Sequence, residues 1–140
     1  AMAKRLKDDL ARDGVPRDEV ERRVEGSIRR FTQSPALILV CLTMEGMDAY
    51  PDAPRRRAEH IMAVQSVAAS IENLLIALHS LGLGACWCCA PLFSQPEVRA
   101  ALGIPEDVEP QALITVGWSD ERPVPPPRLP LERVVHGDGW

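Results

Sequence analysis

The sequence is poor in aromatic residues and carries no excess of positive charge. Its 140 residues include 3 Trp, 1 Tyr and 2 Phe, so few rings are available to stack on a bound ligand. The formal net charge is −4, and a chain without a basic excess has no general affinity for polyanions. The longest strictly apolar run of the central segment, Leu74–Leu78, is much shorter than the ~20 residues of a membrane span. We therefore expect neither a nucleic-acid partner nor a membrane segment.

Histidine is scarce as well, with 3 in the chain. His60, His79 and His136 show none of the spacings with cysteine that mark a zinc site, so we expect no metal centre. The charged N-terminus does not resemble a signal peptide, and the 4 cysteines are therefore interpreted as reduced thiols of a cytoplasmic protein. No Ser-His-Asp set or carboxylate pair is recognisable. Gly82-Leu83-Gly84 closes a helix rather than opening one, so it is not a dinucleotide-binding fingerprint.

What the chain does have is the composition of one globular domain. Hydrophobic residues make up 46% and charged residues 26% of it, and the length suits a single hydrophobic core. We expect one domain over residues 1–140, with Ala1 before Met2 interpreted as a tag remnant.

The first third of the chain predicts two helices and a strand. Residues 2–13 are charged and helix-favouring, and Gly14 is a natural stop. Pro16 suits the first turn of a second helix, whose apolar face follows at helical spacing: Val20, Val24, Ile28 and Phe31. The branched apolar run Ala36–Thr43 predicts a strand buried on both faces, followed by a loop over residues 44–54.

The central segment, residues 55–81, predicts one long helix that is apolar on most sides. Two apolar rows repeat at spacings of three and four: Ile61, Val64, Ala68, Ile71, Leu75 and Leu78, and then Val67, Leu74 and Leu81. A helix of this kind must be buried nearly all round, and a short chain has little else to cover it. We therefore predict a homodimer built around this helix.

The last third predicts a short extended segment, a helix, a strand and a tail. Residues 85–91 are extended, and Ser94 with Glu97 forms a capping box for a helix that ends at Gly103. Residues 111–118 predict a second buried strand. The proline-rich residues 119–140 predict an extended arm that lies over a neighbouring surface.

The order of these elements resembles the nitroreductase family. Three stretches carry the resemblance: "SPALILVCL", "ASIENLLIALHSLGLGACW" and "FSQPEVRAALGIPEDVEPQALITVGWSDERPVPPPRLPLERVV". Together they cover residues 27–135, and they are most similar to the branch fused to the glutamyl ligase of deazaflavin-coenzyme biosynthesis. The resemblance implies an α+β fold with a central antiparallel sheet flanked by helices, and a long helix at the interface of an intertwined dimer.

The resemblance also implies a chemistry and a set of cofactor-binding residues. FMN would accept hydride from NAD(P)H and pass electrons to a nitro, quinone or similar small acceptor, so no protein residue is assigned a catalytic role. Arg128 matches the family's C-terminal phosphate-binding arginine, and Gly84 belongs to its glycine-rich turn. The remaining matches lie in the segment that passes over the flavin: Trp87, Cys88, Cys89 and Ala90.

The sequence departs from the family pattern at its start. The family's Arg-Ser-x-Arg motif and the Pro-Ser-x-x-Asn segment that follows it are absent before the strand, and Gly26–Phe31 is interpreted as part of the preceding helix. The domain is therefore interpreted as N-terminally truncated. An alternative remains open, in which the chain is a non-catalytic dimer that keeps the fold and has lost the flavin.

Two further interpretations of the sequence remain open. Cys86 and Cys89 form a C-x-x-C pair that could act as a redox dithiol, although the pair is not at the start of a helix. Polar residues of the long helix could reach a substrate or form a helix–helix seam: Gln65, Glu72, Asn73 and His79.

Overall fold

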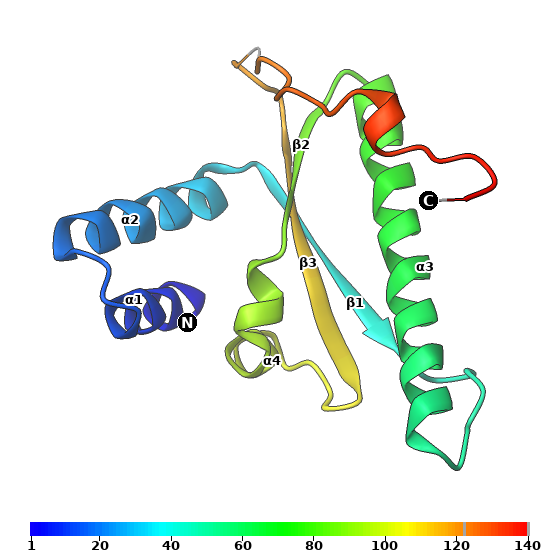
Figure 1. Cartoon of the computed structure of the whole chain (residues 1–140). Helices are drawn as coiled ribbons and strands as arrows, with labels where there is room; N and C mark the ends of the chain where they lie inside the picture. Colours follow the sequence, from blue (N-terminus) through cyan, green and yellow to red (C-terminus); the bar gives the residue numbers. More distant parts are fainter. Residues whose placement is uncertain (122, 140) are drawn as a thin grey trace.

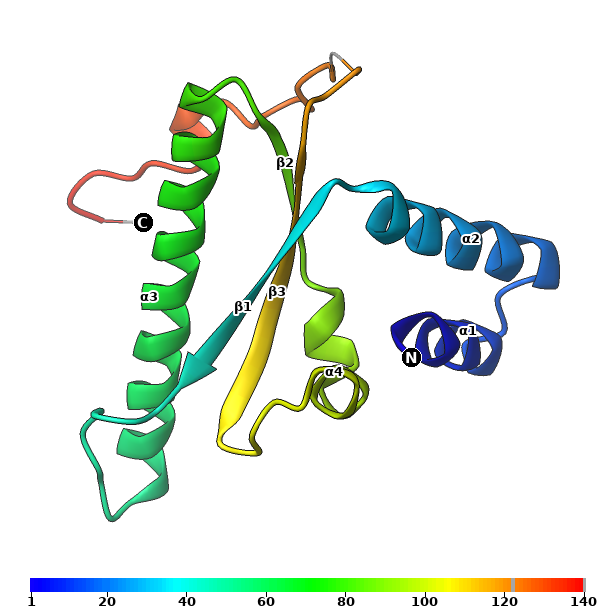
Figure 2. The ribbon, with the colours of Figure 1, turned by 180° about the vertical axis from the view of Figure 1, so that it is seen from behind.

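The computed structural model describes residues 1–121 and 123–139. In this part of the chain the helices and strands follow the order α1 (Met2–Arg12), α2 (Arg17–Gln33), β1 (Ala36–Thr43), α3 (Ala53–Ser80), β2 (Gly84–Cys88), η1 (Ala90–Phe93), α4 (Gln95–Leu102), β3 (Val108–Gly117) and η2 (Leu131–Arg133). Figure 1 shows α3 along one side of the sheet and α1, α2 and α4 on the other side, and Figure 2 shows the same arrangement from behind. The α+β fold predicted from the sequence is confirmed.

The sheet has three antiparallel strands in the order β1-β3-β2, so β3 is central. The register is regular from Ala36 opposite Val116 to Val40 opposite Ala112, and then shifts between Val40 and Cys41. Beyond the shift Cys41 lies opposite Pro110, which has no N–H to donate, and an irregularity in the ladder accommodates such a residue.

The prediction that Ala36–Thr43 is buried on both faces is wrong for this chain. The limits of the strand are as predicted, but Leu42 is its one buried residue, and Leu37 is 44% exposed. The cause is incomplete cover, because α3 packs against one face of β1 whereas α4 and η1, on the other side of the sheet, contact β3. The buried strand is β3, where Pro110–Val116 are all buried.

The helix α3 covers the sheet with one face only. Its Ile71 packs with Ala112, Ile114 and Val116 of β3 to form the core. Its buried residues are Glu59, Ala63 and Ile71, whereas large apolar side chains on its other sides are exposed: Ile61, Met62, Ile76 and, just past its end, Leu81. Within one chain, therefore, most of the apolar circumference that the sequence predicts has no cover.

By length and composition alone α3 could cross a membrane, and 11% of its most apolar 18-residue window is buried in the chain. Isolated polar residues interrupt the run Leu74–Leu78 without lowering the mean hydropathy of the helix much, so the length of the longest run does not by itself exclude a membrane span. The long core helix of a soluble protein can have the same length and composition.

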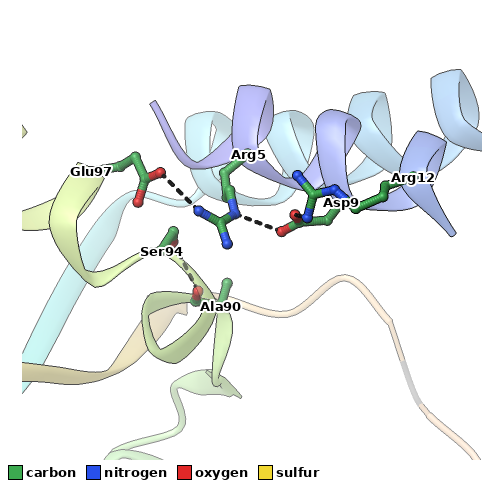
Figure 3. Close-up of polar contacts among 6 residues, drawn as sticks. All are labelled: Arg5, Asp9, Arg12, Ala90, Ser94 and Glu97. Atoms are coloured by element: carbon green, nitrogen blue, oxygen red, sulfur yellow. Dashed lines mark hydrogen bonds and ion pairs between the residues drawn. The ribbon is translucent and has the colours of Figure 1, made fainter.

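The start of α4 corrects the predicted capping box. Ser94 precedes the helix, but its Oγ donates to the carbonyl of Ala90 at 3.0 Å and no side-chain cap bond is formed. Glu97 turns instead toward α1, where its Oε1 lies 3.7 Å from Nη1 of Arg5 (Figure 3). The reason is that Ser94 also ends the 3-10 helix η1, and its hydroxyl satisfies that turn.

Residues 123–139 are extended apart from the short helix η2, which lies beside the C-terminal end of α3 in both views (Figures 1 and 2). The large apolar side chains in this range are more than half exposed: Val124, Leu129, Leu131, Val134 and Val135. Among the described residues, the arm therefore buries little apolar surface within its own chain.

Candidate functional site

A hollow of about 760 Å³ lies between α2 and the end of β2. The helices contribute an apolar and basic wall, and the other wall is the segment that ends β2. The lining residues are Leu6, Arg23, Ser27, Arg30, Phe31, Cys86, Trp87, Cys88, Cys89, Ala90 and Glu121. We refer to this space as the α2–β2 hollow.

A wider groove adjoins the hollow and shares Arg30, Cys86 and Glu121 with it. The groove continues past Arg29 of α2 to His79 near the end of α3 and to the ends of β2 and β3. The two spaces together form a continuous concave surface along α2. Because this surface combines apolar, thiol and guanidinium groups, it is the strongest candidate for a ligand site among the described residues.

The structure brings five of the six predicted cofactor-binding residues to this surface. Trp87, Cys88, Cys89 and Ala90 line the α2–β2 hollow, and Gly84 lines the adjoining groove. Arg128 lines neither space and lies exposed in the tail. Within one chain, Arg128 is therefore separated from the other predicted residues.

Of the polar residues singled out on the long helix, His79 lines the adjoining groove. Gln65, Glu72 and Asn73 are exposed and line neither space. Within one chain, His79 therefore lies at the candidate site, whereas Gln65, Glu72 and Asn73 do not.

Sequence reasoning missed the arginines of α2. Arg22 and Arg29 line the groove, Arg23 lines the hollow, and Arg30 lines both. A signal was available, because residues seven apart, such as Arg23 and Arg30, lie on the same face of a helix. Phe31, which belongs to the predicted apolar face of this helix, lines the hollow together with Arg23 and Arg30.

These arginines differ in how their charge is balanced. Arg22 and Arg23 both bind the carboxylate of Glu19 one turn away. Arg29 and Arg30 form no ion pair with any of the residues that the structure describes. Among the described residues, these two guanidinium groups are therefore not neutralised by a carboxylate, although the side chain of Arg30 hydrogen-bonds the thiol of Cys88.

The segment Cys86–Cys89 adds thiols to the same surface. Sγ of Cys86 lies 3.8 Å from Sγ of Cys88, because alternate residues of a strand point to the same face. The thiols that meet are thus those of a C-x-C pair, not the C-x-x-C pair considered from the sequence. The pKa of the Cys88 thiol is raised, chiefly by burial and then by the neighbouring Cys86, while Arg30 acts in the opposite direction.

Trp87 has its side chain among the core residues on the α3 side of the sheet. Its Nε1 is buried and has no hydrogen-bond partner in the described part of the chain. A buried indole N–H without a partner is costly and calls for an acceptor.

Comparison with known proteins places the chain in a family. The Nitroreductase family model matches residues 1–118, and the chain belongs to that family. A candidate NADH dehydrogenase/NAD(P)H nitroreductase from Methanothermobacter thermautotrophicus is 39% identical over an alignment of 77 residues that covers 50% of this chain and 40% of that protein. A Cr(VI) reductase from a Pseudomonas strain is 26% identical over an alignment of 123 residues that covers 81% of this chain and 49% of that protein. The chain thus spans less than half the length of these relatives.

Solved structures support the same fold. NfrA1 of B. megaterium superposes with a TM-score of 0.64 and 22% identity, covering 80% of this chain and 49% of that one. A variant of NfnB, an FMN- and NADPH-dependent nitroreductase from a Sphigopyxis strain, superposes with a TM-score of 0.56 and 21% identity, covering 96% and 57% of the two chains. The nitroreductase-like fold expected from the sequence is confirmed, and kinship with the deazaflavin glutamyl-ligase branch stays a prediction.

Proposed function

We propose that this chain is the nitroreductase-fold part of an FMN-dependent oxidoreductase that transfers electrons from NAD(P)H to a nitro, quinone or similar small acceptor. The observation that carries the proposal is the meeting of the segment 87–90 with Arg29 and Arg30, which form no ion pair with the described residues, on one concave surface. The names of two relatives, an NAD(P)H nitroreductase and a Cr(VI) reductase, support a reductive activity.

The residues present fit the parts of FMN. The phosphate is a dianion, and the guanidinium forks of Arg29 and Arg30 can hold such a group by charge-assisted hydrogen bonds. The isoalloxazine would lie against the segment that follows Cys88, the last residue of β2 paired with β3. Past that point the N–H groups of Cys89 and Ala90 would donate to the ring. When bound, the flavin supplies the hydride chemistry, and the chain supplies orientation and charge.

The uncovered face of α3 supports a homodimer as the active form. Ile61, Met62 and Ile76 are each close to half exposed or more, and burying an isoleucine side chain stabilises an interface by roughly 1.5–3 kcal/mol. We further propose that residues 1–140 act as one domain with residues 119–140 as an arm, and that the protein is cytoplasmic and has no nucleic-acid or membrane partner.

Titration of the purified chain with FMN tests the cofactor proposal. We expect saturable quenching of flavin fluorescence at micromolar FMN, and bleaching of the bound flavin when NADH or NADPH is added without oxygen. Absence of saturable quenching would contradict the proposal.

A second candidate function is a non-catalytic dimer without flavin. Two observations favour it: Gly26–Phe31 lies inside α2 and is not a separate phosphate-binding motif, and the carboxylates Asp120 and Glu121 line the groove beside the arginines. This candidate predicts a colourless protein that remains a dimer and leaves FMN fluorescence unchanged.

A further inference from the structure

The thiols of Cys86 and Cys88 form a cluster that the proposed flavin chemistry does not use. Both side chains lie on the same face of β2, with 3.8 Å between the sulfur atoms. Cys86 is exposed and Cys88 is buried, and both line the α2–β2 hollow. The pair is therefore open to a small solute on one side and fixed by the sheet on the other.

Strand geometry argues against a disulfide between these two residues. Alternate Cα atoms of a strand lie about 6.6 Å apart, and their Cβ atoms project in parallel from the same face. A disulfide requires a Cβ separation of about 3.5–4.5 Å, so oxidation would have to distort β2 where it pairs with Leu113 and Thr115 of β3.

The same sulfur separation suits one bridging ion. Two thiolates bound to a tetrahedral ion at about 2.3 Å stand about 3.8 Å apart, which equals the separation in this chain. The pair therefore has the spacing of a two-thiolate chelate without any change of the backbone. Thiolate is also the ligand that soft cations prefer.

We propose that Cys86 and Cys88 form a two-thiolate binding site for a soft, thiophilic divalent cation. Each thiol loses its proton on binding, so one ion replaces two protons. In the described part of the chain no third Cys, His, Asp or Glu joins a metal-binding cluster. The remaining coordination positions are therefore taken by water or by a small thiol from solution, and the bound ion lies in the wall of the α2–β2 hollow.

Nearby charges set the pH dependence of this site. Arg30 of α2 lowers the pKa of Cys88, but burial and Cys86 outweigh it and the pKa is raised. Glu121 lines the hollow from the segment after β3, and Arg23 does so from α2. Because each ion that binds releases protons, binding tightens as the pH rises.

The test is a titration of the full, flavin-free chain with cadmium chloride, monitored by thiolate-to-cadmium absorption in the ultraviolet and by proton release. We expect one ion per chain, with about two protons released per ion. Cys86→Ser should weaken binding by about tenfold or more, which corresponds to about 1.4 kcal/mol. Because no flavin takes part, the result is independent of whether FMN binds.

Matched variants keep the test decisive. Cys89→Ser and Cys41→Ser remove the other two thiols, and both should leave the affinity within about twofold of the wild type. Cys86 is exposed, so its serine variant should fold normally, as far-ultraviolet circular dichroism can verify. The proposal is overturned if wild type and Cys86→Ser bind cadmium equally, if about one proton or none is released per ion, or if Cys89→Ser loses as much affinity as Cys86→Ser.

Discussion

His60 on α3 and Glu109 on β3 lie in direct contact, with Nε2 of the histidine 3.1 Å from Oε2 and 3.2 Å from Oε1 of the carboxylate. The two residues are 49 positions apart in the sequence. Gln111 donates a further hydrogen bond to the same carboxylate. This contact joins the N-terminal half of α3 to the first residues of β3.

The first prediction is that this pair contributes little to stability. Its side chains are 42% and 30% exposed, and pairs of this kind contribute roughly 0.2–1 kcal/mol. A double-mutant cycle of His60→Ala and Glu109→Ala, followed by urea unfolding, should give a coupling energy in that range. A coupling energy well above this range would show that the contact is more buried in solution.

Gly117 gives a prediction about close packing. A Cβ at this position would lie 2.8 Å from Cδ of Pro35 and 3.1 Å from its Cγ. The proline ring cannot rotate away, so the connection between α2 and β1 must move. Gly117→Ala should therefore lower the free energy of unfolding by about 1–3 kcal/mol.

Gly26 is the matched control. It lies within α2, and a Cβ there would meet nothing within 4 Å. Gly26→Ala should raise the free energy of unfolding by about 0.4–1 kcal/mol. Equal effects of the two substitutions in urea unfolding would contradict the packing around Gly117.

Asp52 gives a prediction about pH. Its side chain accepts a hydrogen bond from the backbone N–H of Arg55 at 3.0 Å and so caps α3. That bond, with a second from the Arg55 side chain, lowers the pKa of Asp52 below its usual 3.8. A lowered pKa means that the stabilisation is present above the usual value and is lost as the pH falls through the folded-state pKa.

Two substitutions isolate this cap. Asp52→Ala should lower the melting temperature at neutral pH. Asp52→Asn should lower it much less, because asparagine also caps helices well. Between neutral pH and about pH 2, the advantage of wild type over Asp52→Asn should disappear. A difference in melting temperature that does not change with pH would argue against the ionised cap.

The sequence predicted the elements well where local signals define them. Gly14, Pro16 and Gly103 gave the limits of the first two helices and of α4, and the branched run Ala36–Thr43 gave β1. The predictions were wrong where burial or hydrogen bonding depends on residues distant in sequence. The exposure of β1 depends on which elements cover each face of the sheet, and no local pattern encodes this cover. The hydroxyl of Ser94 had two possible partners, of which the structure selects Ala90.

The candidate site was likewise predictable from the sequence only in part. The resemblance pointed to Trp87, Cys88, Cys89 and Ala90, and the structure gathers them in one hollow. The arginines opposite them could not be found in this way, because whether a helical arginine faces solvent or a cavity depends on how α2 packs. The approach of Cys86 to Cys88 could have been predicted, because alternate residues of the extended segment expected over 85–91 lie on the same face.

The arginines give a prediction that separates the phosphate from the ring. A hydrogen bond to a charged group contributes about 1.5–3 kcal/mol, so Arg29→Ala or Arg30→Ala should weaken FMN binding by roughly tenfold to a hundredfold. Riboflavin lacks the phosphate, and its affinity should not change. Arg17→Ala is the control, because Arg17 pairs with Glu21 and lines neither space. Equal losses for FMN and riboflavin would exclude these arginines as the phosphate site.

The uncovered face of α3 gives the last prediction. Ile76 is 60% exposed in the single chain, so a charge at this position should not disturb the monomer but should oppose any contact that covers the helix. We expect the wild type to sediment as a dimer without detergent, Ile76→Glu to sediment as a folded monomer, and Ile76→Leu to remain a dimer because it keeps the apolar surface. If the wild type sediments as a monomer, the proposed dimer interface on α3 is wrong. If it requires detergent to stay in solution, α3 is covered by lipid instead, as its length and composition permit.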